Sequence, residues 1–187
     1  HDFDSLLRSF RNVMEKTETK PWLSFHSVWP SENRIEAAFS GLKTYAQTWT
    51  LHQLAKRRVV SRSSRQILRD THLRLLEHVH CDPKATWLLC YVESHVRWTQ
   101  RAPVAFANQI APTGLVMSRP FRLMEASSRT RPDVTPVGTF TINKAAPDEC
   151  WLLADVLAQT LPLVYREGAD LVEERLDMAE AKSYWRA

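Results

Sequence analysis

Apolar residues near the start of the chain recur at helical spacing. One stripe behind Ser5 is formed by Leu6, Leu7, Phe10, Val13 and Met14. This spacing predicts an amphipathic helix over residues 5–16. Residues 21–30 are rich in aromatic side chains and bounded by prolines. Because proline removes a hydrogen-bond donor from a sheet, this segment predicts a short strand near a sheet edge.

Two further helical patterns follow. Ser31 is a good N-cap residue, and behind it one apolar stripe is formed by Ile35, Ala38, Phe39, Leu42, Ala46 and Trp49. We therefore expect a helix from Ser31 to about Lys56. After a break at 59–64, a second stripe is formed by Ile67, Leu68, Leu75, Leu76 and Val79. This second helix should end at 80–84, where a proline disfavours further helix.

From Thr86 the period changes to strict alternation, which is typical of a strand. We expect Trp87 to Trp98 to form a central strand, with one buried face made of Leu88, Cys90, Val92 and Val96. Residues 103–110, 114–126 and 136–143 indicate further strands, separated by turns rich in Pro, Ser and Arg. Four successive strands with short links favour an antiparallel meander over 86–143.

The C-terminal part returns to helical patterns. Pro147 suits the first turn of a helix, whose stripe consists of Trp151, Leu152, Val156, Leu157 and Leu161, and Pro162 should stop it. Residues 169–185 predict an acidic amphipathic helix. Together the patterns predict a single α+β domain over 1–187. It would have a helical N-terminal half, an antiparallel sheet of four to five strands, helices packed mainly on one face and two C-terminal helices.

Composition narrows the class of protein. Of 187 residues, 44% are hydrophobic and 25% are charged, as in ordinary globular domains. The four glycines argue against glycine-rich phosphate loops, and no P-loop, dinucleotide fingerprint or Gly-x-Ser-x-Gly occurs. Cys81, Cys90 and Cys150 are odd in number and form no CxxC pair, so we expect a reducing, cytoplasmic setting. No apolar run approaches about 18 residues, so we expect no membrane association.

Charge is unevenly distributed and points to an anionic partner. Residues 148–187 carry nine acids against four bases, a net charge of −5; the whole chain carries +4, so residues 1–147 carry +9. The most basic stretch contains Lys56, Arg57, Arg58, Arg62, Arg65, Arg69 and Arg74.

The spacing of four of these arginines suggests a binding face. If 56–74 is mostly helical, a single face of that helix holds Arg58, Arg62, Arg65 and Arg69. Such guanidinium groups can each bind two phosphate oxygens. The alternative is a solvated face, or pairing with tail acids Glu173, Glu174 and Asp177.

Two short motifs resemble those of nucleic-acid enzymes. His78-Val79-His80 resembles the histidine–hydrophobe–histidine motif of rolling-circle nickases, which implies a divalent metal beside a tyrosine nucleophile, here Tyr165 or Tyr184. Asp82 with Glu93-Ser94-His95 resembles the Asp…Glu-x-Lys arrangement of metal-dependent nucleases, with histidine where that family has lysine.

The remaining candidate ligands are close in sequence but match no zinc template. Structural zinc sites use two short-spaced ligand pairs, which is not the spacing of His72, His78, His80, Cys81, Cys90 and His95. We therefore expect no metal and no cofactor.

These observations favour a non-enzymatic binding or regulatory module that contacts nucleic acid or another polyanion through its arginine-rich helix. The alternative is an α+β sensor or scaffold domain for a small ligand or a protein partner. A metal-dependent nuclease or nickase is the third hypothesis. The acidic segment 169–185 is the candidate surface for a protein partner or a homodimer.

Overall fold

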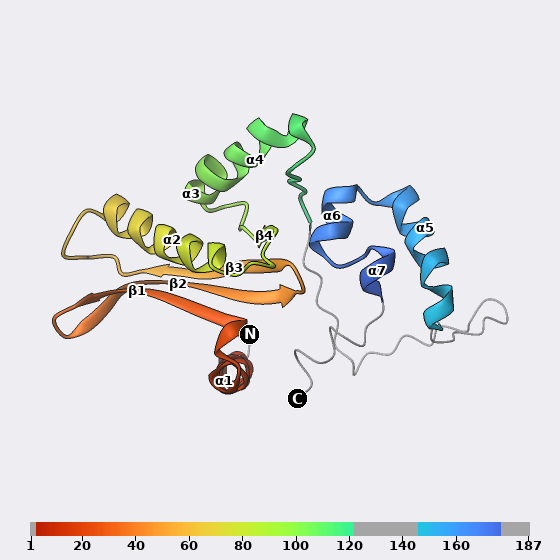
Figure 1. The fold of residues 1–187 in the computed structure, drawn as a ribbon. Coiled ribbons are helices and arrows are strands. Elements are labelled where there is room, and N and C mark those ends of the chain that lie inside the picture. The colour runs from red at the N-terminus through yellow and green to blue at the C-terminus, as the bar shows by residue number, and fades with distance from the viewer. Residues whose placement is uncertain (1–2, 122–145, 177–187) are drawn as a thin grey trace, which may run out of the picture.

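The computed structural model describes residues 3–121 and 146–176, and its centre is a four-stranded sheet (Figure 1). The strands lie in the order β1-β2-β3-β4. Their bounds are Ser24–Ser31 for β1, Arg34–Tyr45 for β2, Thr48–Lys56 for β3 and Trp87–Cys90 for β4. The first three are antiparallel neighbours, whereas β4 runs parallel to β3. A parallel pair needs a crossover, which here contains helix α2 (Ser64–His80).

Helices lie on both sides of the sheet, and more of them lie on the side of α2 than on the opposite side. Figure 1 places α2, α3 (Arg97–Thr99) and α4 (Ala105–Ile110) on one side and α1 (Phe3–Thr19) on the other. A second helical group holds α5 (Cys150–Thr160), α6 (Leu163–Gly168) and α7 (Glu173–Leu176). The described residues also contain short helical turns: η1 (Pro21–Leu23), η2 (Gln100–Val104), η3 (Ala111–Thr113) and η4 (Pro147–Glu149). The predicted α+β class, with a mostly antiparallel sheet, is confirmed.

The core lies between α2 and the sheet. The buried positions of α2 repeat at helical spacing at Ile67, Thr71, Leu75 and Val79. They oppose buried strand residues that alternate along β2 and β3, namely Ala37, Phe39 and Trp49. Gly41 belongs to the same strand face, because a Cβ added there would lie 3.0 Å from Leu75 Cδ1. The helix therefore packs directly on β2.

The helix expected over 31–56 is wrong: this segment forms the β2–β3 hairpin, and Ser31 ends β1. The apolar residues named above satisfy a period of 3.6, but Ala37, Phe39 and Gly41, which face α2, alternate with a period of two. Threonines at 44, 48 and 50 favour strands because their branched side chains fit a pleated surface. Packing against α2 decided between the two periods, and the N-terminal half consequently contains strands as well as helices.

The central strand expected from Trp87 to Trp98 is also wrong. β4 ends at Cys90 and is an edge strand. Its exposure is opposite to the prediction: Leu88 is 51% exposed and Cys90 is exposed, while Trp87 and Leu89 are half-buried. The strand is short because β3 pairs with it only over Thr48 to Leu51.

The predicted meander is not found in the described residues. Residues 103–110 lie in η2 and α4, where the alternation of small apolar residues with Phe106 was compatible with a helix. Residues 114–121 are irregular; the rest of the strand expected at 114–126, and all of that at 136–143, lies outside the described residues.

Other predicted elements are confirmed. α1 covers the expected 5–16, β1 is an edge strand, α2 ends at His80, and α5 follows Pro147 and stops before Pro162. In the tail, 169–172 is not helical, α7 covers Glu173–Leu176, and 177–185 lies outside the described residues. Within the described ranges, no helix has the length and apolar content to cross a membrane.

Candidate functional site

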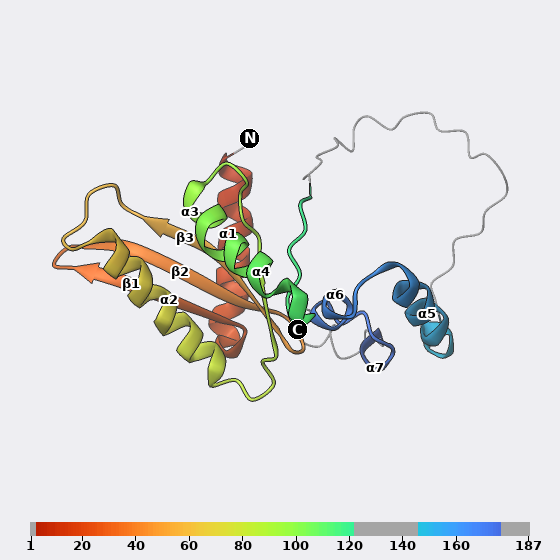
Figure 2. The ribbon, with the colours of Figure 1, turned by 90° about the horizontal axis from the view of Figure 1, so that it is seen from above.

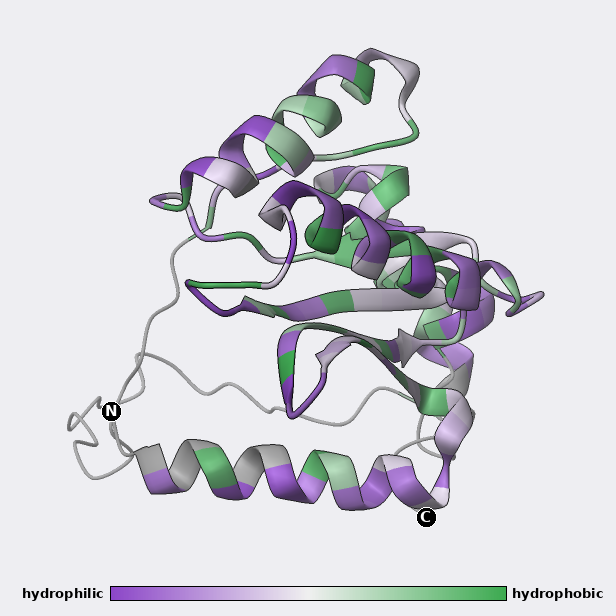
Figure 3. Ribbon diagram, turned by 90° about the vertical axis from the view of Figure 1, so that its left-hand side faces the viewer, coloured by the Kyte–Doolittle hydropathy of each residue, from purple (hydrophilic) through white to green (hydrophobic). Residues whose placement is uncertain are grey.

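The β1–β2 turn, the end of β3 and the start of α2 meet at one end of the sheet (Figures 1 and 2). These segments, with the loop between β3 and α2, carry six basic residues. We define this basic end by Arg34, Lys56, Arg57, Arg58, Arg62 and Arg65. The view onto this end shows how hydrophilic its turns and helix start are (Figure 3). The acids of the same segments are Glu32, in the β1–β2 turn, and Glu36, in β2.

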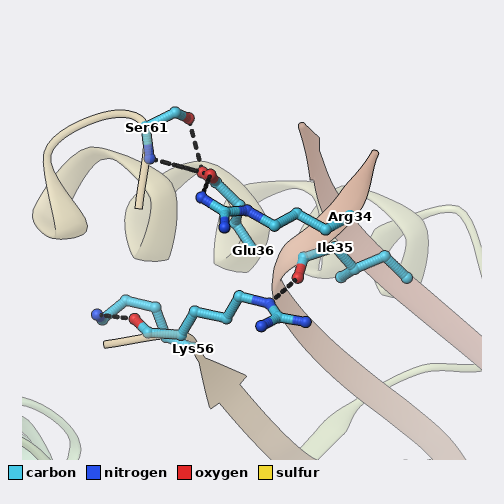
Figure 4. A network of polar contacts seen from close by, with 6 residues as sticks. Arg34, Ile35, Glu36, Lys56 and Ser61 are labelled. Atoms are coloured by element: carbon cyan, nitrogen blue, oxygen red, sulfur yellow. Dashed lines mark hydrogen bonds and ion pairs between the residues drawn. The ribbon is translucent and has the colours of Figure 1, made fainter. Parts of the chain in front are cut away.

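Glu36 fastens the loop that carries the arginines (Figure 4). Its carboxylate is fully buried on β2 and accepts hydrogen bonds from the Ser61 backbone N–H at 2.9 and 3.0 Å and from the Ser61 hydroxyl at 2.6 Å. The Arg34 guanidinium lies 3.6 Å from Glu36 Oε1. Nearby, Arg57 Nε donates to the Ile35 carbonyl at 3.0 Å. The loop 57–63 is thus held against the sheet at both ends.

The hydrogen bonds keep Glu36 ionised. The Ser61 hydroxyl and then its backbone N–H lower the pKa of Glu36, and Arg34 adds to this effect against the opposing effect of burial. Because the folded-state pKa is the lower one, this stabilisation is present at neutral pH and is lost as pH falls through the folded-state value.

Replacing Glu36 by glutamine should loosen this loop. The amide keeps the shape but loses the charge that strengthens the hydrogen bonds from Ser61. We expect faster amide hydrogen exchange in peptides covering 57–63, with little change in peptides covering Leu75 to Val79. The matched control is Glu32→Gln, in the β1–β2 turn. Unchanged exchange at 57–63 would show that Glu36 does not anchor the loop.

The structure separates the basic run into two groups. The helix begins at Ser64, so Arg58 and Arg62 lie in the loop, and the single helical face expected for four arginines is reduced to Arg65 and Arg69. Arg69 pairs with Asp70 at 2.9 Å, and Arg74 lies 3.3 Å from Glu77. Among the described residues, no carboxylate lies within ion-pair distance of Arg58, Arg62 or Arg65. These three exposed arginines are the available cations.

The alternative, in which acids of the tail pair with the basic run, is not found in the described part of the tail. Arg175 in α7 bonds Asp170 at 3.1 Å, and Asp170 also accepts the Ala46 N–H at 2.7 Å. No ion pair joins the basic run to Glu173 or Glu174, and Asp177 lies outside the described residues. The described part of the tail thus contacts the β2–β3 turn, at the end of these two strands opposite the basic end.

The histidine motif is divided between core and solvent. His78 stacks on Phe25 with ring centroids 3.9 Å apart and meets Trp49 edge-on. Burial lowers its pKa, although Asp82 opposes this shift. His80 is exposed on another side of the helix end. The two rings therefore do not converge as the nickase resemblance implies.

Asp82 and Glu93, the two carboxylates of the nuclease-like motif, have different partners and different exposure. Asp82, two residues after α2, accepts hydrogen bonds from Lys43 Nζ at 2.6 Å and Trp49 Nε1 at 2.9 Å. Glu93 and His95 form an exposed pair at 3.2 Å after β4. In the part of the chain that the structure describes, no group of three or more His, Cys, Asp or Glu side chains could hold a metal ion.

Trp29 is the feature of this end that sequence reasoning missed as a site residue. It lies on β1, half-buried, with the Arg62 guanidinium carbon 5.9 Å from its ring centroid. Indole and guanidinium groups attract at this distance. Only the aromatic content of 21–30 hinted at it, since the two residues are far apart in sequence.

Comparison with known proteins gives no match: no protein-family model, no curated protein and no solved structure is similar to this chain. The site therefore has to be interpreted from its own geometry.

Proposed function

We propose that this chain is a binding module for nucleic acid or a similar polyanion, and that the basic end contacts the phosphates. The observation that carries the proposal is the set of exposed cations Arg58, Arg62 and Arg65, which have no carboxylate partner among the described residues. Guanidinium groups suit this task because each presents several donors in a plane to phosphate oxygens.

The start of α2 supports the same ligand. This helix is 17 residues long, and its N-cap residue Ser63 makes no side-chain capping hydrogen bond. The first N–H groups of a helix have no partner within the helix, and the helix dipole makes this end positive. Phosphate groups bind readily at such ends. Arg62 and Arg65 flank these N–H groups in sequence, so positive charge and hydrogen-bond donors occur together in this segment.

A salt titration tests the proposal. We expect the variant Arg58→Ala/Arg62→Ala/Arg65→Ala to bind mixed-sequence oligonucleotides more weakly. Its plot of log affinity against log salt concentration should be shallower by about 0.7–0.9 per arginine, because binding releases fewer counterions when fewer phosphates are contacted. Fluorescence anisotropy at several salt concentrations measures both quantities.

The matched control removes the same charge elsewhere. Arg11→Ala/Arg101→Ala/Arg119→Ala replaces three exposed arginines away from the basic end, and its salt slope should stay close to that of the wild type. Equal slopes for both triple variants and the wild type would contradict the proposal, as would absence of binding by the wild type at low salt.

A further inference from the structure

We infer that this module binds single-stranded nucleic acid, and that one base of the bound strand stacks on a platform formed by Trp29 and Arg62. This inference rests on the proposed function and names its substrate class. Phosphates alone would not distinguish a duplex from a single strand, whereas an accessible aromatic platform does, because bases in a duplex are already stacked on each other.

A groove beside the platform has the chemistry that bases require. It is an open groove of about 460 Å³ between β1 and α2, and the residues lining it include Val28, Trp29, Asp70, Leu73, Arg74 and Glu77. Its apolar surface includes Val28, 46% exposed, and Leu73, 50% exposed. Its charged groups are compensated, since Asp70 pairs with Arg69 and Arg74 with Glu77.

The distribution of charge indicates where the backbone and the bases of the bound strand lie. The groove carries paired charges and apolar walls, so it suits the largely uncharged faces of bases. The basic end begins where the groove reaches Trp29, because Arg62 lies over this ring. A single strand can therefore place its backbone along Arg58, Arg62 and Arg65 while a base turns toward the groove. Proteins that bind single strands combine a cationic track with aromatic stacking in this way.

The Arg62–Trp29 contact prepares the platform. The attraction between guanidinium and indole favours one position of a long side chain that would otherwise be free. Less rotamer entropy is then lost when a nucleotide binds. A guanidinium plane also stacks on bases, so both members of the pair offer a flat surface.

The test compares a single-stranded oligothymidine of about 12 nucleotides, within the usual range of site sizes, with a hairpin duplex. We expect Trp29→Ala to weaken single-strand binding about tenfold or more. The salt slope should not change, because no phosphate contact is lost, and duplex binding should fall much less than single-strand binding. Trp29→Phe should restore most of the affinity, which a variant that merely misfolds would not allow. Trp151→Ala, on exposed α5, is the matched control.

Three other outcomes overturn the inference. If Trp29→Ala leaves single-strand affinity unchanged while the triple arginine variant loses binding, the proposed function stands and the stacking platform is wrong. Equal losses for single strand and duplex would mean that Trp29 acts only by holding Arg62. If the wild type binds neither oligonucleotide, the proposed function fails as well, and an extended peptide pairing with edge strand β1 becomes the better occupant of the groove.

Discussion

Replacing Asp82 by alanine is expected to lower the free energy of unfolding by about 3–5 kcal/mol, because it removes one partner of a buried ion pair. The side chains of Lys43 and Asp82 are only 9% and 16% exposed. Without the carboxylate, the Lys43 ammonium group loses its partner in a site where it is almost fully buried, and Trp49 Nε1 loses its acceptor. Urea denaturation followed by circular dichroism measures the change.

The control removes both charges together. Lys43→Met/Asp82→Leu should recover part of the loss, since two apolar groups of similar size can replace a buried pair at little cost. The exposed pair gives the comparison: Glu77→Ala, which removes the partner of Arg74, should cost less than about 1 kcal/mol. A similar small cost for Asp82→Ala would show that Lys43 reaches water when its partner is removed.

The same pair should make stability depend on pH. Burial disfavours the ionised form of Asp82, but hydrogen bonds from Lys43, Trp49 and the Lys84 backbone N–H outweigh this and lower its pKa. The unfolded chain therefore takes up this proton at a higher pH than the folded chain does. The stabilisation is complete above the unfolded-state pKa, is lost as pH falls from about 5, and should be absent in Asp82→Asn.

The sequence predicted those elements whose pattern admits one interpretation. The stripes of α2 and α5 are bounded by proline or a polar break, and their spacing fits no strand. The segment 31–56 admits two interpretations, because Phe39, Leu42 and Trp49 satisfy helical spacing while Ala37, Phe39 and Gly41 alternate. Contact with α2 selects the strand, and such contact between distant segments is not visible in a local pattern.

The candidate site was predicted only in part for the same reason. The basic run identified Arg58, Arg62 and Arg65 as candidate cations, but its prediction of one common face needed a continuous helix over 56–74. The loop is instead held by Glu36, 25 residues from Ser61 in sequence. Trp29 joins the site only because the β1–β2 hairpin brings its strand beside the start of α2. A net charge pattern identifies cations, whereas their partners depend on the fold.

Leu75→Ala should destabilise the protein by about 2–5 kcal/mol, because it opens a cavity between α2 and the sheet. Leu75 is fully buried. Gly41→Ala alone should also be unfavourable, by about 1–3 kcal/mol, since the added methyl group would lie 3.0 Å from Leu75 Cδ1 and 3.4 Å from Trp49 Cε3. The two substitutions change the same space in opposite directions.

The double variant therefore tests the packing of β2 on α2 directly. In Leu75→Ala/Gly41→Ala the new methyl group enters the space that the leucine leaves, so the double variant should be more stable than the sum of the single changes implies, by about 1 kcal/mol or more. Leu73→Ala, on the exposed side of α2, is the matched control and should add to Gly41→Ala without coupling. Additive effects for Leu75 and Gly41, within about 0.5 kcal/mol, would mean that the two residues do not meet.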